Sequence, residues 1–304
     1  MKKNIEKSSR AKADLFELLI CQGLINYFRL PGNYTEEIKA LRKTLSTFPD
    51  GKLRIKDQEE KAKRLLPHIG KLLKRKGQNQ GGVKDILWIG RVFRANKTLA
   101  DVKVIFGSND SIGISLKSVG VGTGTQKNIG YKSVKECLQV DLDKELKNMW
   151  LKIRTTLMKM GGEYSKISAL SQKAIKDSKY QYPKIQEFAR KLAEPIQILA
   201  TRESVKNFNR LPLKDKINFL KILLGYDQKL ELLTIIVSQK NILSYSNDKY
   251  DSLVTGEVKV EAKAIKDKSY GIFINGQLAL RIQSSFTNGV GLSAFCQRAF
   301  LTNI

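Results

Sequence analysis

An aspartate, a serine and a lysine are predicted to share one face of a β-hairpin between residues 99 and 118. Side chains alternate between the two faces of a strand, and apolar residues alternate with others on both sides of the Gly107–Ser111 turn. The apolar set is therefore expected to face a core, with Asp101, Ser115 and Lys117 on the other face. Folding about the turn is predicted to bring Asp101 opposite Lys117. An acid beside a lysine is the minimal set for holding a metal ion and an attacking water. The alternative is an ordinary hairpin with a polar solvent face.

The chain is strongly basic. Its 304 residues include 55 lysines and arginines against 29 aspartates and glutamates, a formal net charge of +26. Such an excess opposes compaction through self-repulsion, so a polyanionic partner is expected, and nucleic acid is the leading one. The alternative is a composition that merely reflects a lysine-rich proteome.

Several other chemistries are poorly supported by the residues present. The three cysteines, Cys21, Cys137 and Cys296, form neither a disulfide framework nor a metal knuckle. The single histidine, His68, has no ligand cluster around it, which argues against zinc. The glycines between residues 120 and 124 lack the Lys-Ser/Thr of a phosphate loop. No convincing signal peptide or membrane span is predicted, so a reducing cytoplasm is the expected location.

Hydrophobic periodicity predicts helices and strands in alternation, an α/β (α+β) class. Helices are expected over residues 12–29, 35–47, 52–76, 133–160, 165–205 and 214–224. Strands are expected over 85–94 and 231–239, and a second hairpin over 270–285 turns at Asn275-Gly276. A boundary near Gly161-Gly162 would divide the chain into a catalytic core, 1–160, and a second region, 161–304, although a single domain is also consistent with the pattern.

The stretch ADVKVIF…IGISLKS resembles the catalytic core of type II restriction endonucleases of the PD-(D/E)xK nuclease superfamily. In that superfamily a strand-borne Asp is followed, after a turn, by an acid-x-Lys on the next strand. Asp101 and Lys117 match these positions, while Ala100 replaces the usual Pro and Ser115 replaces the second acid. The resemblance implies a central mixed β-sheet flanked by helices, a restriction-endonuclease-like core with helical additions.

The resemblance also implies a Mg²⁺ site that cleaves double-stranded DNA to 5′-phosphate and 3′-hydroxyl ends. Some enzymes with Ser-x-Lys take their second acid from a helix. Glu136, in the helix that follows the glycine-rich loop, is the first candidate, and Glu17, among apolar neighbours in the first helix, is the second. The Leu116 carbonyl would complete the protein ligands, and Lys117 would orient the attacking water.

DNA contacts are expected at two other places. The C-terminal part of the lysine-rich helix should touch phosphates, and the C-terminal hairpin region carries side chains suited to reading bases. The residues are Lys71, Lys74, Arg75 and Lys76 for phosphates, and Arg281, Gln283, Asn288 and Arg298 for bases. A restriction enzyme of this kind is expected to be a homodimer paired functionally with a cognate DNA methyltransferase. The alternatives are a repair or junction-resolving nuclease and a non-catalytic, basic nucleic-acid-binding protein.

Overall fold

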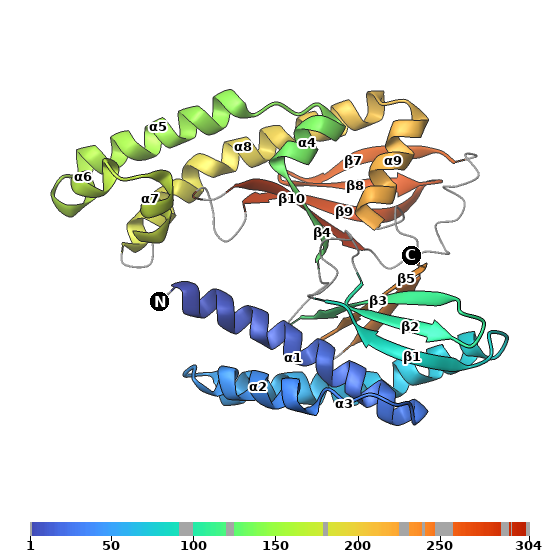
Figure 1. Ribbon diagram of the computed structural model, residues 1–304. Coiled ribbons are helices and arrows are strands. Elements are labelled where there is room, and N and C mark those ends of the chain that lie inside the picture. The colour runs from blue at the N-terminus through green and yellow to red at the C-terminus, as the bar shows by residue number, and fades with distance from the viewer. Residues whose placement is uncertain are drawn as a thin grey trace. The chain divides into compact units, whose positions relative to one another are not determined.

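The chain forms two units, each built from a sheet and helices (Figure 1). The computed structural model describes residues 2–90, 100–119, 125–178, 182–224, 231–238, 241–246, 258–286, 292 and 294–301. The first unit comprises Met1–Gly124 and Gly225–Asp251, and the second comprises Thr125–Leu224 and Ser252–Ile304. Helices and strands in both units confirm the predicted α+β class, with two sheets in place of one. No described helix is both long and apolar enough to cross a membrane.

The expected boundary after residue 160 falls inside the second unit. Gly161 and Gly162 adopt positive φ, +69° and +53°, and form a tight turn between two helices. The glycine pair is used here for its left-handed backbone and does not link two domains.

The first unit has a mixed sheet of five strands in the order β1-β2-β3-β5-β6. Only the β3–β5 pair is parallel. Its elements are α1 (Lys2–Phe28), α2 (Thr35–Ser46), α3 (Gly51–Gly77), β1 (Val83–Trp88), β2 (Val102–Phe106), β3 (Ser111–Ser118), β5 (Glu231–Val237) and β6 (Ile242–Ser246). The predicted helices over 12–29, 35–47 and 52–76 are confirmed, and the strand predicted over 85–94 ends at Trp88.

The alternating apolar residues of β2 and β3 enter one core, as predicted. Val102, Val104 and Phe106 cluster there with Ile112, Ile114 and Leu116, and with apolar residues of α1 and α3. These two helices therefore cover one face of the first sheet, while α2 packs on α1. Residues of β5 are buried on both faces, which suits its nearly continuous apolar sequence.

The parallel pairing of β3 and β5 explains the discontinuous first unit. A parallel pair needs a crossover connection, and here that connection contains the residues from Thr125 to Leu224 of the second unit. The chain thus leaves the first sheet after β3 and returns to it as β5.

The β2–β3 hairpin differs from the prediction by two residues in register. Val102 lies across from Ile114, so Asp101 continues the ladder toward Ser115 and not toward Lys117. The turn is shorter than predicted, because the Asn109 N–H bonds the Phe106 carbonyl and Asn109 adopts a φ of 67°. A shift of two residues leaves every side chain on its predicted face.

The second unit has an antiparallel sheet in the order β4-β10-β9-β8-β7. Its elements are β4 (Thr125–Gly130), α4 (Tyr131–Leu138), α5 (Asp143–Met160), α6 (Gly162–Ser168), α7 (Gln172–Ser178), α8 (Pro183–Arg210), α9 (Leu213–Leu224), β7 (Val260–Lys266), β8 (Ser269–Ile274), β9 (Gln277–Phe286) and β10 (Phe295–Leu301). The predicted β8–β9 hairpin is confirmed, since Asn275 and Gly276 both have positive φ. The helix predicted over 133–160 is interrupted at Gln139, which has a φ of 53°.

The long helix α8 packs along β7, β8 and β9 (Figure 1). Its side chain Asn209 both donates to the Ala262 carbonyl and accepts from the Ala262 N–H, at 2.9 and 2.8 Å. Because β7 is an edge strand, these bonds occupy backbone groups that would otherwise be open to another strand. The predicted loop over 119–130 contains β4, and Gly120, Gly122 and Gly124 lie outside the described residues.

Candidate active site

Asp101 is held on both sides by the backbone of neighbouring strands. Its N–H donates to the Ile114 carbonyl at 2.8 Å, and its carbonyl accepts from the Ile89 N–H at 2.9 Å. Its carboxylate Oδ2 accepts from the Leu116 N–H at 2.7 Å. The side chain therefore has one defined orientation, across the start of β2 toward the end of β3.

Lys117 and Ser115 complete the group expected on this face. The Lys117 Nζ lies 3.9 Å from Asp101 Oδ2, and both side chains are largely buried, at 26 and 18% exposed. Ser115 is fully buried, and no described residue forms a hydrogen bond with its Oγ. A buried hydroxyl without a partner costs about 1–3 kcal/mol. This end of the sheet thus brings together an acid, a lysine and a polar oxygen that is unsatisfied within the described chain.

Glu17 reaches the same region from α1. The Trp88 indole Nε1–H donates to Glu17 Oε2 at 2.8 Å. A Cβ on Gly90 would lie 2.3 Å from the same oxygen, so a larger residue here would require the Glu17 carboxylate to move. Since Ile89, between these two residues, bonds the Asp101 backbone, the segment 88–90 connects the two carboxylate residues.

The pKa of the Cys21 thiol is affected by the same two carboxylates. Burial raises the pKa of its thiol well above the ordinary value, and the negative charges of Glu17 and Asp101 raise it further. Both carboxylates therefore lie close enough to act on one sulfur atom. A neutral, buried thiol is a poor nucleophile, so Cys21 serves as packing beside the carboxylates.

Glu136, the first candidate for the second acid, belongs to the second unit. It lies on α4 with its side chain 61% exposed and its carboxylate 3.8 Å from Lys132 Nζ. The chain has already left the first sheet before it reaches this helix. Of the two candidates, only Glu17 shares a unit with Asp101 and Lys117.

The donor set of the first unit suits a hard cation. Asp101 and Glu17 supply carboxylate oxygens, the Leu116 carbonyl is the third protein oxygen expected, and Ser115 Oγ adds an unsatisfied hydroxyl. Mg²⁺ binds oxygen and keeps several waters, so two carboxylates are enough for it. Within the described residues, no three or more His, Cys, Asp or Glu side chains gather as metal ligands.

Sequence inspection missed Trp88 and Gly90. Their role depends on Glu17, which is 71 residues away from Trp88 in the chain, and nothing local in the strand signals it. Glycine directly after a strand was the only available sign of a close approach.

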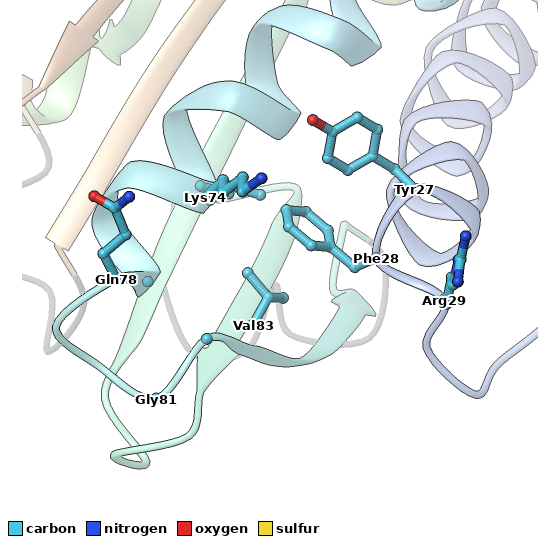
Figure 2. A pocket seen from close by; sticks show the side chains of 10 residues that line it. Tyr27, Phe28, Arg29, Lys74, Gln78, Gly81 and Val83 are labelled. Carbon is cyan, nitrogen blue, oxygen red and sulfur yellow. The ribbon is translucent and has the colours of Figure 1, made fainter.

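The cavity in Figure 2 lies away from these residues. It has a volume of about 580 Å³ and lies among the C-terminal ends of α1 and α3 and the start of β1. Tyr27, Phe28, Arg29 and Lys74 line it, and neither Asp101 nor Glu17 does. The strand β1 begins at this cavity with Val83 and ends beside Glu17 with Trp88.

The residues predicted to contact DNA fall in both units. Lys71 and Arg75 are exposed on α3, Lys74 is exposed and lines the cavity, and Lys76 pairs with Glu231 on β5. Gln283 is exposed on β9, whereas Arg281 and Arg298 are half-buried, and Asn288 lies outside the described residues. Gln297, in the same region, is fully buried and bonded within the second unit, so it is not available to a ligand.

No protein-family model matches the chain, and no curated protein sequence is similar to it.

Proposed function

We propose that this chain is a Mg²⁺-dependent endonuclease that hydrolyses phosphodiester bonds in double-stranded DNA, of the type II restriction class. The observation that carries the proposal is the approach of Lys117 Nζ on β3 to Asp101 Oδ2, directly before β2, at 3.9 Å. The mixed sheet around them agrees with the PD-(D/E)xK resemblance, and the net charge of +26 suits a polyanion.

Glu17 takes the place of the acid that Ser115 replaces. It supplies a carboxylate from a helix, as the Ser-x-Lys variant of that superfamily does, and Trp88 holds it in place. Asp101, Glu17 and the Leu116 carbonyl would hold the cation. When bound, Mg²⁺ polarises the scissile phosphate and lowers the pKa of a bound water.

The chain's own groups have separate tasks in this reaction. The Leu116 N–H keeps the Asp101 carboxylate in one orientation. The Lys117 ammonium donates hydrogen bonds to the attacking water and to the phosphate oxygens that gain negative charge. Attack in line on phosphorus would leave a 5′-phosphate and a 3′-hydroxyl.

Substitution at Asp101 or Lys117 tests the proposal. Asp101→Asn and Lys117→Ala are each expected to lower the rate of Mg²⁺-dependent plasmid cleavage by about 10³-fold, or roughly 4 kcal/mol, because each removes a charge from the reacting region. Binding of DNA in Ca²⁺ should remain. Asp110→Asn, an exposed aspartate at the tip of the same hairpin, is the matched control and should cleave normally. Full cleavage by the Asp101→Asn protein would refute the assignment.

The form of the products tests the class of nuclease. A restriction enzyme yields discrete fragments from unmethylated plasmid and fewer from plasmid carrying the cognate methylation. A repair or junction-resolving enzyme would cut branched or damaged DNA and leave intact plasmid whole. Gel-filtration mass in the presence of DNA would test the expected homodimer.

A further inference from the structure

The second sheet has one face covered by α8 and one face that turns away from it. Thr201 and Ser204 of α8 bond Ser284 on β9 and Gln297 on β10. Successive side chains point to opposite faces, so Gln283 and Arg298, next to these residues in sequence, face away from α8. We call this second surface the open face.

Hydrogen-bonding side chains form a row across the open face. Arg298 on β10 lies directly across from Gln283 on β9 and, on its other side, from Asn128 on β4. Gln283 in turn lies across from Ser269 on β8, and Ser269 from Lys266 on β7. The row of exposed or half-buried side chains therefore spans β4, β10 and β9, whereas Ser269 on β8 is buried and Lys266 on β7 follows a bulge.

The members of this row have unused hydrogen-bonding capacity. Asn128, Gln283 and Lys266 are exposed, and no described residue bonds their side chains. Arg298 donates a long bond from Nη2 to the Phe286 carbonyl, at 3.4 Å, and its side chain also interacts with the Cys296 thiol, while its buried Nε makes no hydrogen bond to a described nitrogen or oxygen atom. A guanidinium with weak bonds and an incompletely satisfied nitrogen can take an acceptor from a ligand.

A second row places two cations over aromatic rings. The Arg281 guanidinium lies 4.8 Å from the centroid of the Phe300 ring, and Lys263 Nζ lies 5.2 Å from that of Phe273. These contacts hold both cations on the sheet surface. The one acid in the five strands, Glu261, is neutralised by Lys263 at 2.6 Å.

We infer that the open face of the second sheet binds double-stranded DNA and reads its bases through Arg298, Gln283 and Asn128. Arginine pairs with guanine and the amide side chains pair with adenine at base edges. Arg281 and Lys263, held by their rings, contact phosphates, which orient the duplex without specifying its sequence. The choice of duplex DNA as the partner rests on the proposed function.

The test measures binding without cleavage. Full-length Asp101→Asn protein, in Ca²⁺, is used to select from a pool of short randomised DNA duplexes, and binding is then followed by fluorescence anisotropy. Gln283→Ala and Arg298→Ala should each weaken binding of the selected duplex by about ten- to a hundredfold and relax selection at particular positions. Binding of unselected duplex should change by less than about twofold. Lys263→Ala should weaken binding of both duplexes alike.

Gln277→Ala is the matched control, because Gln277 is an exposed glutamine of the same strand at its turn, outside the row. Thermal unfolding of each variant checks that the second unit stays folded. The inference is overturned if the Gln283→Ala/Arg298→Ala double variant selects the same sequence with the same affinity. Selection without cleavage by the unsubstituted protein in Mg²⁺ would refute the nuclease and support the open face as a reader. Cleavage with no selected sequence would support the nuclease and refute the open face as a reader of sequence.

Discussion

A buried polar network in the second unit and a buried serine in the first unit differ in whether their hydrogen bonds are satisfied. In the second unit, the Tyr270 hydroxyl donates to Gln297 Oε1 at 3.0 Å, and Gln297 Nε2 donates to Ser204 Oγ at 2.8 Å. In the first unit, Ser115 is equally buried, yet no described residue bonds its Oγ. The network of Tyr270, Gln297 and Ser204 thus pairs its polar groups between helix and sheet, whereas Ser115 Oγ has no partner among the described residues and lies beside a carboxylate and a lysine.

Buried polar groups can stabilise a fold, or they can take part in binding and reaction. A fully paired network rigidifies a core and fixes how α8 sits on its sheet. A buried hydroxyl that is incompletely satisfied costs stability, and a ligand of the proposed site could supply its missing hydrogen bond. The unsatisfied Ser115 hydroxyl agrees with the reaction site proposed in the first unit.

The largest expected effect comes from substituting each of the two candidate glutamates separately. Glu17→Gln should lower the Mg²⁺-dependent cleavage rate by about 10²- to 10³-fold, or roughly 3–4 kcal/mol, because it removes the carboxylate charge and keeps the Trp88 contact. Glu136→Gln, on an exposed helix of the second unit, should cleave at a normal rate. Initial rates on supercoiled plasmid provide the measurement.

A reversed result would place the second acid on α4, as first expected from the sequence. Equal cleavage by both variants would show that neither glutamate is required, and the site would then depend on Asp101 and Lys117 alone.

A stability measurement sharpens the same contrast. Gln297→Ala should lower the free energy of unfolding by about 3 kcal/mol, because it leaves Tyr270 and Ser204 buried without their bonds. Ser115→Ala should raise it by about 1–3 kcal/mol, since no hydrogen bond within the described chain is lost and the cost of burying the hydroxyl is removed. Urea unfolding followed by circular dichroism measures both. A large loss for Ser115→Ala would mean that its hydroxyl is structurally satisfied.

The smallest expected effect concerns the hydrogen bonds of the Tyr131 hydroxyl in the second unit. The Tyr131 hydroxyl donates to Asp143 Oδ1 at 2.8 Å and accepts from the Leu142 N–H at 2.7 Å, which ties α4 to the start of α5. Tyr131→Phe should lower stability by about 1 kcal/mol. Equilibrium unfolding of the two proteins near neutral pH measures the difference.

The hydrogen bonds of Tyr131 predict that stability depends on pH. Burial raises the pKa of Tyr131 to about 12, and its hydrogen bond to Asp143 contributes to the rise. The folded chain thus holds the phenolic proton more tightly than the unfolded chain, whose tyrosine pKa is about 10. The stabilisation is complete below pH 10 and is lost as the pH rises toward 12. The stability difference between wild type and Tyr131→Phe should shrink over this interval; a constant difference would contradict the assignment.

Local patterns in the sequence were sufficient for the faces of the first hairpin and for the second hairpin's turn. Alternation with a period of two placed Asp101, Ser115 and Lys117 on one side, because it depends only on strand geometry. Asn275-Gly276 predicted a tight turn because both residues tolerate positive φ.

Tertiary structure determined the strand register and the spatial neighbours of these residues. Asn109 in a left-handed conformation shortened the turn and moved the register by two residues, which sequence spacing does not reveal. Topology assigns Glu17 and Glu136 to different units. Because β5 pairs in parallel with β3, much of the chain between them belongs to the second unit, and Glu136 lies in that part. Glu17 meets the site through Trp88, a contact between residues far apart in sequence that only the packing of α1 on the sheet creates.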